Sequence, residues 1–297
     1  MKKGLLFLAL AVLMILAIFV FSKKDRGVQN YTEQHYMNKD GLIHAYPDQP
    51  ESEYLSESIG LYLEYLLHVK DEEAFRQQVD LLEQQFIKTE QSPLILWLLR
   101  EDVQVNALID DVRIISALQT AADIFNENHY NELAQSLKVS MEEKQRVNGL
   151  YVDFRGNDPK QTANRITLSY LTLDFFSILD HTEPTKKLLM QVGEKNSFFP
   201  EYYALESESF QYGKEVHLID QLLIALNLHA IGMDSPKFDS WIQQEWNTQK
   251  KLYGRYLRIS GAPSVKYESL SVYAYAWEYF EAKGLTEQAV QVKKRAD

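Results

Sequence analysis

The feature that most constrains the fold is a repeated alternation between two kinds of predicted helix. Helices that are apolar on most faces are predicted near 53–69, 108–124, 163–180, 215–232 and 268–282. Between them lie amphipathic helices with one charged side, near 71–88, 128–144, 236–250 and 285–295, and a shorter run at 184–194. The apolar kind recurs at intervals of roughly fifty residues, which is the length of a helical hairpin repeat.

This alternation predicts an all-α protein with two concentric layers, an α/α toroid in which inner helices line an axis and outer helices return the chain. An open solenoid of helix pairs is the competing architecture, but a solenoid requires similar, stackable repeats, and these hairpins share little sequence. The loops also favour the toroid, because those that enter inner helices are long (89–107, 195–214) and those that leave them are short (126–128). Long loops gathered on one face usually carry the function.

Composition excludes several classes of function. The 297 residues include 31 Lys and Arg against 42 Asp and Glu, a formal net charge of −11, so no basic surface for nucleic acid is expected. The absence of cysteine excludes disulfides, thiol catalysis, Cys-bound zinc and a lipid-modified N-terminal cysteine. The seven histidines are scattered without a common ligand spacing, so we expect no metal and no other cofactor.

The N-terminus predicts a membrane anchor at 1–26. Its apolar run, 4–21, is long enough to cross a bilayer as a helix, and bulky residues follow Ala17 where a signal peptidase requires small ones. An uncleaved, single-pass anchor is therefore favoured over a secreted, cleaved form. Positive charges on both sides of the run leave the orientation open. We expect a linker at 27–50, interrupted by two prolines, and an extracytoplasmic domain at 51–297.

Acidic residues lie near the predicted starts of the inner helices. With Ser52 as N-cap, Glu57 falls close to the start of the first, where it either pairs with the positive helix end or donates a proton at the rim of a cavity. Asp220 interrupts an apolar helix, where an unpaired charge is costly unless an Arg or Tyr satisfies it. Further acids near such starts are Asp110, Asp111, Glu215 and Glu268.

Several acids around an aromatic-lined cavity suit glycoside hydrolysis. One protonated carboxyl donates to the leaving oxygen, and a second, ionised one activates water or attacks carbon. Trp97, Tyr203 and Tyr212, in the long loops, offer flat apolar faces on which sugar rings can stack. Asp111 has an alternative role, because it could equally pair with Arg113 or cap its helix.

Two short stretches carry a resemblance to a known family. Ser56-Glu57-Ser58-Ile59-Gly60-Leu61 resembles the Ser-Glu-Gly-x-x-Tyr-Gly stretch of the family 8 glycoside hydrolases. The stretch 111–118, Asp-Val-Arg-Ile-Ile-Ser-Ala-Leu, is similar to their Asp-Leu-Asp-Ile-Ala-Tyr-Ala-Leu. The resemblance is to a divergent relative, close to the exopolysaccharide-degrading branch found beside polysaccharide synthesis systems. Ser58, Leu61 and Arg113 depart from the family pattern.

The resemblance implies a six-hairpin α/α barrel and an inverting endo-hydrolase that acts on a cell-surface or biofilm exopolysaccharide. Glu57 would be the general acid, and Asp111 would bind and distort the sugar at the cleavage point. The segment 212–220 lies where the family has its base but does not match, so Asp220 is the first choice of base and Glu215 the second. The residues expected to bind substrate are Asp111, Glu215, Tyr212, Tyr203 and Trp97.

Two other functions remain open at this stage. The poor match around the base fits a non-catalytic glycan-binding or scaffolding subunit on the same toroid, which would bind glycans without turnover. The same barrel could also perform lyase or glucuronyl hydrolase chemistry, which would give unsaturated products or require uronic acid substrates. The expected partners are a polysaccharide, the membrane through the N-terminal helix, and an exopolysaccharide synthesis system.

Overall fold

The computed structural model describes residues 27–89 and 92–296, which form five helical hairpins. The inner helices are α2 (Ser56–Val69), α4 (Leu108–Phe125), α6 (Leu173–Ile178), α8 (Leu218–Ala230) and α10 (Leu270–Ala282). The outer helices are α3 (Glu72–Leu81), α5 (Asn128–Lys144), α7 (Glu183–Leu189), α9 (Pro236–Gln249) and α11 (Thr286–Ala296). The described part of the chain thus has the five predicted pairs, not the six of the family resemblance.

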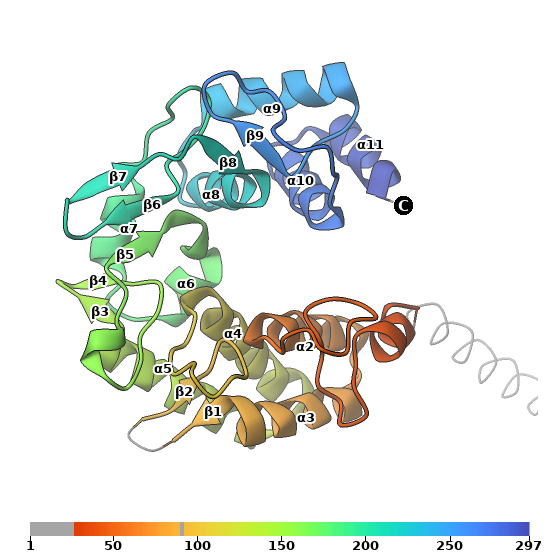
Figure 1. Ribbon diagram of the computed structural model, residues 1–297, viewed down its shortest axis with the longest axis vertical. Helices are drawn as coiled ribbons and strands as arrows, with labels where there is room; N and C mark the ends of the chain where they lie inside the picture. The colour runs from red at the N-terminus through yellow and green to blue at the C-terminus, as the bar shows by residue number, and fades with distance from the viewer. Residues whose placement is uncertain (1–26, 90–91, 297) are drawn as a thin grey trace, which may run out of the picture.

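The inner helices form an arc (Figure 1). Helix α2 packs on α4, α4 on α6, and α8 on α10, and outer helices cover α2, α4 and α10. The side chains that the inner helices bury are aliphatic or aromatic, for example Leu63 and Leu66 of α2, Ile115 of α4 and Leu222 of α8. Burial of these apolar side chains is the main force that holds the two layers together.

Tight reversals join two of the inner helices to their outer partners. Lys70, after α2, and Asn126, after α4, adopt the left-handed conformation, with φ of 57° and 55°. The backbone N–H of each then bonds to carbonyls in the last turn of the helix that it ends. Because the outer helix begins within two residues, the chain reverses at once, which explains the short loops on this face.

The long loops contain short antiparallel strands that the sequence did not predict. Strands β1 (Ile87–Lys88) and β2 (Leu94–Ile95) form one pair, and β3 (Arg146–Val147) and β4 (Leu150–Tyr151) form another. A three-stranded sheet contains β5 (Arg165–Thr167), β6 (Tyr202–Ala204) and β7 (Ser209–Gln211), and β8 (Glu215–His217) pairs with β9 (Arg255–Leu257). A π-helical turn, Leu82–Phe86, connects α3 to β1. The strands stiffen the face on which the inner helices begin.

Three predicted boundaries were wrong. Helix α2 begins at Ser56, after an extended Leu55, so Ser52 does not cap it and Glu57 lies in its first turn. The predicted helix 163–180 is a strand, a 3₁₀ turn and the short α6, because β5 pairs with β6 and the Thr172 side chain caps α6. The predicted helix 215–232 likewise starts only at Leu218, after β8.

Residues 27–50 do not form the expected linker. Residues 27–35 are helical, the turns that follow place Ile43 in the core, and His44 bridges to Tyr54 just before α2. This segment is therefore part of the domain. The predicted anchor at 1–26 lies outside the described residues, and within 27–89 and 92–296 no helix is long and apolar enough to cross a bilayer.

Candidate active site

Glu57 lies in the first turn of α2 and borders a cavity of about 440 Å³, here called the rim cavity. Its wall combines α2 with the N-terminal segment and includes Tyr36, His44, Tyr62 and Tyr65, with Ser271 from the start of α10. The Tyr62 hydroxyl is buried without a hydrogen-bond partner. Glu57 itself is exposed to solvent. Water would therefore be excluded from its surroundings, as a proton donor requires, only when a ligand is bound.

Asp110 links the starts of α2 and α4. Its carboxylate accepts a hydrogen bond from Ser56 Oγ at 3.1 Å and another from Arg113 Nη1 at 3.0 Å, and the residue is 6% exposed. Burial raises the pKa of Asp110 to about 6, against the attraction of Arg113 and with a smaller contribution from the negative charge of Glu57. The carboxyl of Asp110 can therefore hold a proton near neutral pH while Glu57 lies nearby.

Asp111 has a different set of partners from Asp110. It is 2% exposed and accepts a hydrogen bond from Asn106 Nδ2 at 2.8 Å, while its other carboxylate oxygen has no partner. Burial raises the pKa of Asp111 well above its ordinary value. The residue has almost no exposed surface, so its position does not support direct sugar binding. Arg113, offered as a partner for Asp111, pairs with Asp110 instead.

Asp220 lies in the first turn of α8 and is partly accessible. Its carboxylate accepts a hydrogen bond from the buried Ser169 hydroxyl at 2.8 Å, and His217 Nδ1 lies 3.5 Å away. Ser169 belongs to the 3₁₀ turn Leu168–Tyr170 that packs on α8. The carboxylate is therefore partnered by a serine hydroxyl, not by the Arg or Tyr considered from the sequence.

Tyr170 shows which acids share one region. Burial, followed by the negative charges of Asp153, Asp110 and Asp220, raises the pKa of Tyr170 to about 12. The phenol thus lies within electrostatic range of the starts of both α4 and α8, while Asp110 lies within range of Glu57 on α2. Tyr170, Ser169, Ser56 and Arg113 were missed as site residues, and only Arg113, three positions after Asp110, had a spacing that could have revealed its role.

The other predicted residues are distributed more widely. Glu215 is exposed on β8, with an oxygen 3.8 Å from Arg255 Nη1 of β9. Lys195 Nζ and the Arg258 guanidinium lie 5.3 Å and 5.2 Å from the centre of the Tyr212 ring, and the Tyr203 ring packs edge-on against Phe210. Trp97 is 38% exposed, and its carbonyl accepts the backbone N–H of Ser56. Of the three aromatic residues, only Trp97 is tied to the start of α2.

Asp153, a second buried acid near Tyr170, holds the loop that leads into this region. It is 3% exposed and accepts hydrogen bonds from Arg165 Nε at 2.8 Å, from Thr167 Oγ1 at 2.7 Å and from the Thr167 backbone. Because Thr167 directly precedes the turn that carries Ser169 and Tyr170, Asp153 fixes their position. Within the described ranges, no group of three or more His, Asp or Glu residues is arranged to hold a metal ion.

Comparison with known proteins provides independent information about the family. No protein-family model matches the sequence. The chain is 35% identical over 251 residues to a Bacillus subtilis (strain 168) protein named "Putative lipoprotein YdaJ", a match that covers 81% of this chain and 68% of YdaJ.

Solved structures agree with this relationship. PssZ from Listeria monocytogenes is 33% identical, with a TM-score of 0.85 over 91% of this chain and 86% of PssZ. Endoglucanase Cel10 from Klebsiella pneumoniae, a family 8 glycosyl hydrolase, is 15% identical, with a TM-score of 0.65 over 90% of this chain and 98% of Cel10. The second comparison shows a shared fold, that of the family 8 α/α barrels.

Proposed function

We propose that this chain, which belongs to the family of YdaJ and PssZ and has the fold of the family 8 glycoside hydrolases, hydrolyses a polysaccharide at the cell surface. The observation that carries the proposal is a set of neighbouring acids, because Asp110 and Asp220 lie near Tyr170 and Glu57 lies near Asp110. Glu57, Asp110 and Asp220 lie in the first turns of three inner helices, on the face with the long loops. Carboxylates held in different surroundings at one site are what glycoside hydrolysis requires.

The proposed reaction uses two of these acids directly. Glu57 donates a proton to the glycosidic oxygen as the bond breaks. Asp220, held by Ser169, takes a proton from the water that attacks from the opposite side of the ring, which inverts the configuration at the anomeric carbon. An inverting pair has its carboxyl groups roughly 6.5–9.5 Å apart, with room for that water between them. Trp97, next to the start of α2, offers a stacking surface for the sugar.

Asp110 has a supporting role in this proposal. With a pKa of about 6, it changes from a neutral hydrogen-bond donor to a carboxylate within the pH range in which cells live. In its charged form it places a second negative charge within electrostatic range of Glu57. The buried Asp111 then holds Asn106 and the loop around it, without touching the sugar.

The decisive experiment compares Glu57→Gln with Glu53→Gln in the full chain. Both changes remove one exposed carboxylate. We expect Glu57→Gln to reduce the release of reducing ends from an exopolysaccharide of the source organism by a factor of roughly 10² or more, as for loss of a general acid, and Glu53→Gln to leave it unchanged. Undiminished release by Glu57→Gln would exclude this residue as the donor. NMR of the first product's anomeric proton tests inversion, since a retained configuration contradicts it.

A non-catalytic glycan-binding function is the second candidate. The observation in its favour is the exposure of Glu57, whose surroundings do not exclude water in the chain alone. In that case the wild-type protein would bind polysaccharide without releasing any product, and Glu57→Gln would bind equally well. A single experiment with both readouts, retention on immobilised polysaccharide and release of reducing ends, separates the two functions.

The proposed tether is the apolar segment 4–21. YdaJ is named as a lipoprotein, and a lipid anchor of the usual bacterial kind is attached to a cysteine, which this sequence lacks. Deletion of 1–26 should release the protein from the membrane fraction, and externally added protease should degrade the full-length protein on intact cells. Retention of the deleted form in the membrane, or full protection from protease, would contradict this topology.

A further inference from the structure

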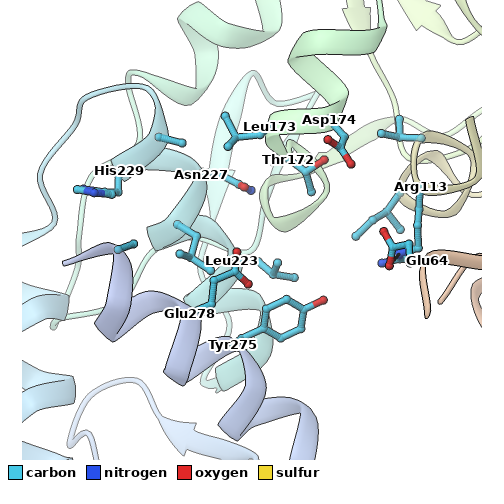
Figure 2. Close-up of a pocket in the computed structure, with 15 residues that line it drawn as sticks. Glu64, Arg113, Thr172, Leu173, Asp174, Leu223, Asn227, His229, Tyr275 and Glu278 are labelled. Atoms are coloured by element: carbon cyan, nitrogen blue, oxygen red, sulfur yellow. Dashed lines mark ion pairs between the residues drawn. The ribbon is translucent and has the colours of Figure 1, made fainter. Parts of the chain in front are cut away.

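A second cavity, of about 550 Å³, lies between the inner helices, and we call it the central cavity. All five inner helices contribute to its wall, which includes Glu64 of α2, Arg113 of α4, Asp174 of α6, Asn227 of α8 and Glu278 of α10 (Figure 2). Its volume falls within the range of sites for small organic ligands. The cavity adjoins the candidate active site, because Arg113 lines it and bonds to Asp110.

The wall of this cavity includes a hydrogen-bond donor without a partner, the side-chain amide of Asn227. The residue is only 6% exposed, and its side-chain Nδ2 is buried without an acceptor. Figure 2 shows the amide among the side chains that surround the cavity. A buried donor left unpaired is costly, so an acceptor oxygen on a ligand would be bound favourably here.

The charges around the cavity define what kind of ligand fits. Three carboxylates line it, those of Glu64, Asp174 and Glu278, and its basic groups are the Arg113 guanidinium and the His229 imidazole. The Arg113 guanidinium is already paired, since it bonds to Asp110 at 3.0 Å and lies 3.8 Å from Glu64. The side chains of Asp174 and Glu278 have no hydrogen bond or ion pair to any other described residue. The cavity therefore repels anions and attracts a positive group.

The apolar side chains of the wall further limit the kinds of ligand that can fit the cavity. Leu173, Leu223 and the ring of Tyr275 provide apolar surface between the polar groups. The walls also withdraw water from Glu64 and Glu278 and raise the pKa of each, although both side chains remain open to solvent. A ligand with apolar ring faces, hydroxyl oxygens and a positive charge matches these surroundings, and a uronic acid does not.

We infer that the central cavity binds a sugar unit that carries a protonated amine, its ammonium group paired with the free carboxylates and one of its oxygens accepting from Asn227. The inference rests on the proposed function in taking the ligand to be a carbohydrate, and it narrows the substrate to a polysaccharide that contains deacetylated amino sugars. The binding itself does not require hydrolysis.

Calorimetric titration of the full-length protein in detergent tests the inference. The probes are the β-1,4-linked disaccharide of glucosamine, its N,N′-diacetyl form, and glucuronic acid. We expect the free amine form to bind, the acetylated form to bind more weakly by roughly tenfold, and glucuronic acid not to bind.

Matched variants locate the site. Glu278→Gln and Asp174→Asn should each weaken binding of the glucosamine disaccharide by roughly tenfold. The control is Glu281→Gln, which removes an exposed acid that lies on α10, as Glu278 does, but outside the cavity, and which should leave binding unchanged. Equal affinity in all three variants, equal binding of glucuronic acid, or no binding of the free amine form would each overturn the inference. If the wild type still hydrolyses polysaccharide in that event, the proposed function stands without it.

Discussion

The Ser56 hydroxyl donates a hydrogen bond to the Asp110 carboxylate at 3.1 Å and so joins the first turns of α2 and α4. This contact places a buried acid, with its pKa raised to about 6, beside the exposed Glu57. The neighbouring Asp111, one position further along α4, points to a different set of partners around Asn106. Adjacent acids on one helix therefore have separate roles.

The first prediction concerns the pH dependence of stability. The ordinary pKa of Asp110 is 3.8 and its folded value is about 6, so the folded chain binds more protons than the unfolded chain between these values. The free energy of unfolding should therefore fall as pH rises through this range, by roughly 3 kcal/mol from this residue. Asp110→Asn should remove that part of the decline in urea unfolding curves recorded at several pH values.

The control for this prediction is Glu206→Gln, which removes an exposed carboxylate in the turn between β6 and β7 and should keep the wild-type dependence. Burial also raises the pKa values of Asp111, Glu64 and Glu278, and each of them makes the free energy of unfolding fall as pH rises. Part of the pH-dependent decline should therefore persist in Asp110→Asn. If the free energy of unfolding of Asp110→Asn depended on pH as steeply as that of the wild type, burial would not control the titration of Asp110.

The second prediction separates Asp111 from the substrate. Asp111→Ala should lower the free energy of unfolding by about 1–3 kcal/mol, because the buried Asn106 amide loses one of its two acceptors and keeps only Gln145. Asp111→Asn, which preserves the shape, should cost less. Neither change should raise KM for polysaccharide more than about twofold, since the residue is buried. A large rise in KM at unchanged stability would mean that Asp111 reaches the sugar after all.

The third prediction decides between the two candidate bases. Asp220→Asn should reduce turnover by a factor of roughly 10² or more, whereas Glu215→Gln should remain close to wild type because its carboxylate is exposed and lies beside Arg255. Ser169→Ala removes the hydrogen bond that orients Asp220 and should have an intermediate effect. Single-turnover rates measure all three. The reverse order, with Glu215→Gln the slowest, would identify Glu215 as the base.

The fourth prediction concerns the loop that carries Ser169 and Tyr170. Asp153→Ala should lower the free energy of unfolding by about 2–4 kcal/mol, because Arg165 and Thr167 lose a charged, buried acceptor. Turnover should fall as well, since Ser169 then holds Asp220 less firmly. Asp158→Asn, an exposed acid in the same loop, is the control for both measurements. Wild-type turnover in Asp153→Ala would contradict the link between this loop and Asp220.

Hydrophobic periodicity was sufficient to predict the layered helical fold. Inner helices such as α4 must bury most of their faces, so the pattern is visible in any short window of the sequence. Glu57, Asp110 and Asp220 were also identifiable, because a charge near the start of a largely apolar helix stands out from its neighbours. The short reversals at Lys70 and Asn126 further indicated antiparallel pairs.

Other features depend on contacts between residues far apart in the sequence, and only the tertiary structure decided them. Whether Asp110 or Asp111 faces the inner helices depends on the rotation of α4 against α2, and a rotation of that kind leaves no local signal. The strands in the long loops exist because segments such as β5 and β6 meet across more than thirty intervening residues. The central cavity, with its unpaired Asn227 amide, forms only where all five inner helices come together.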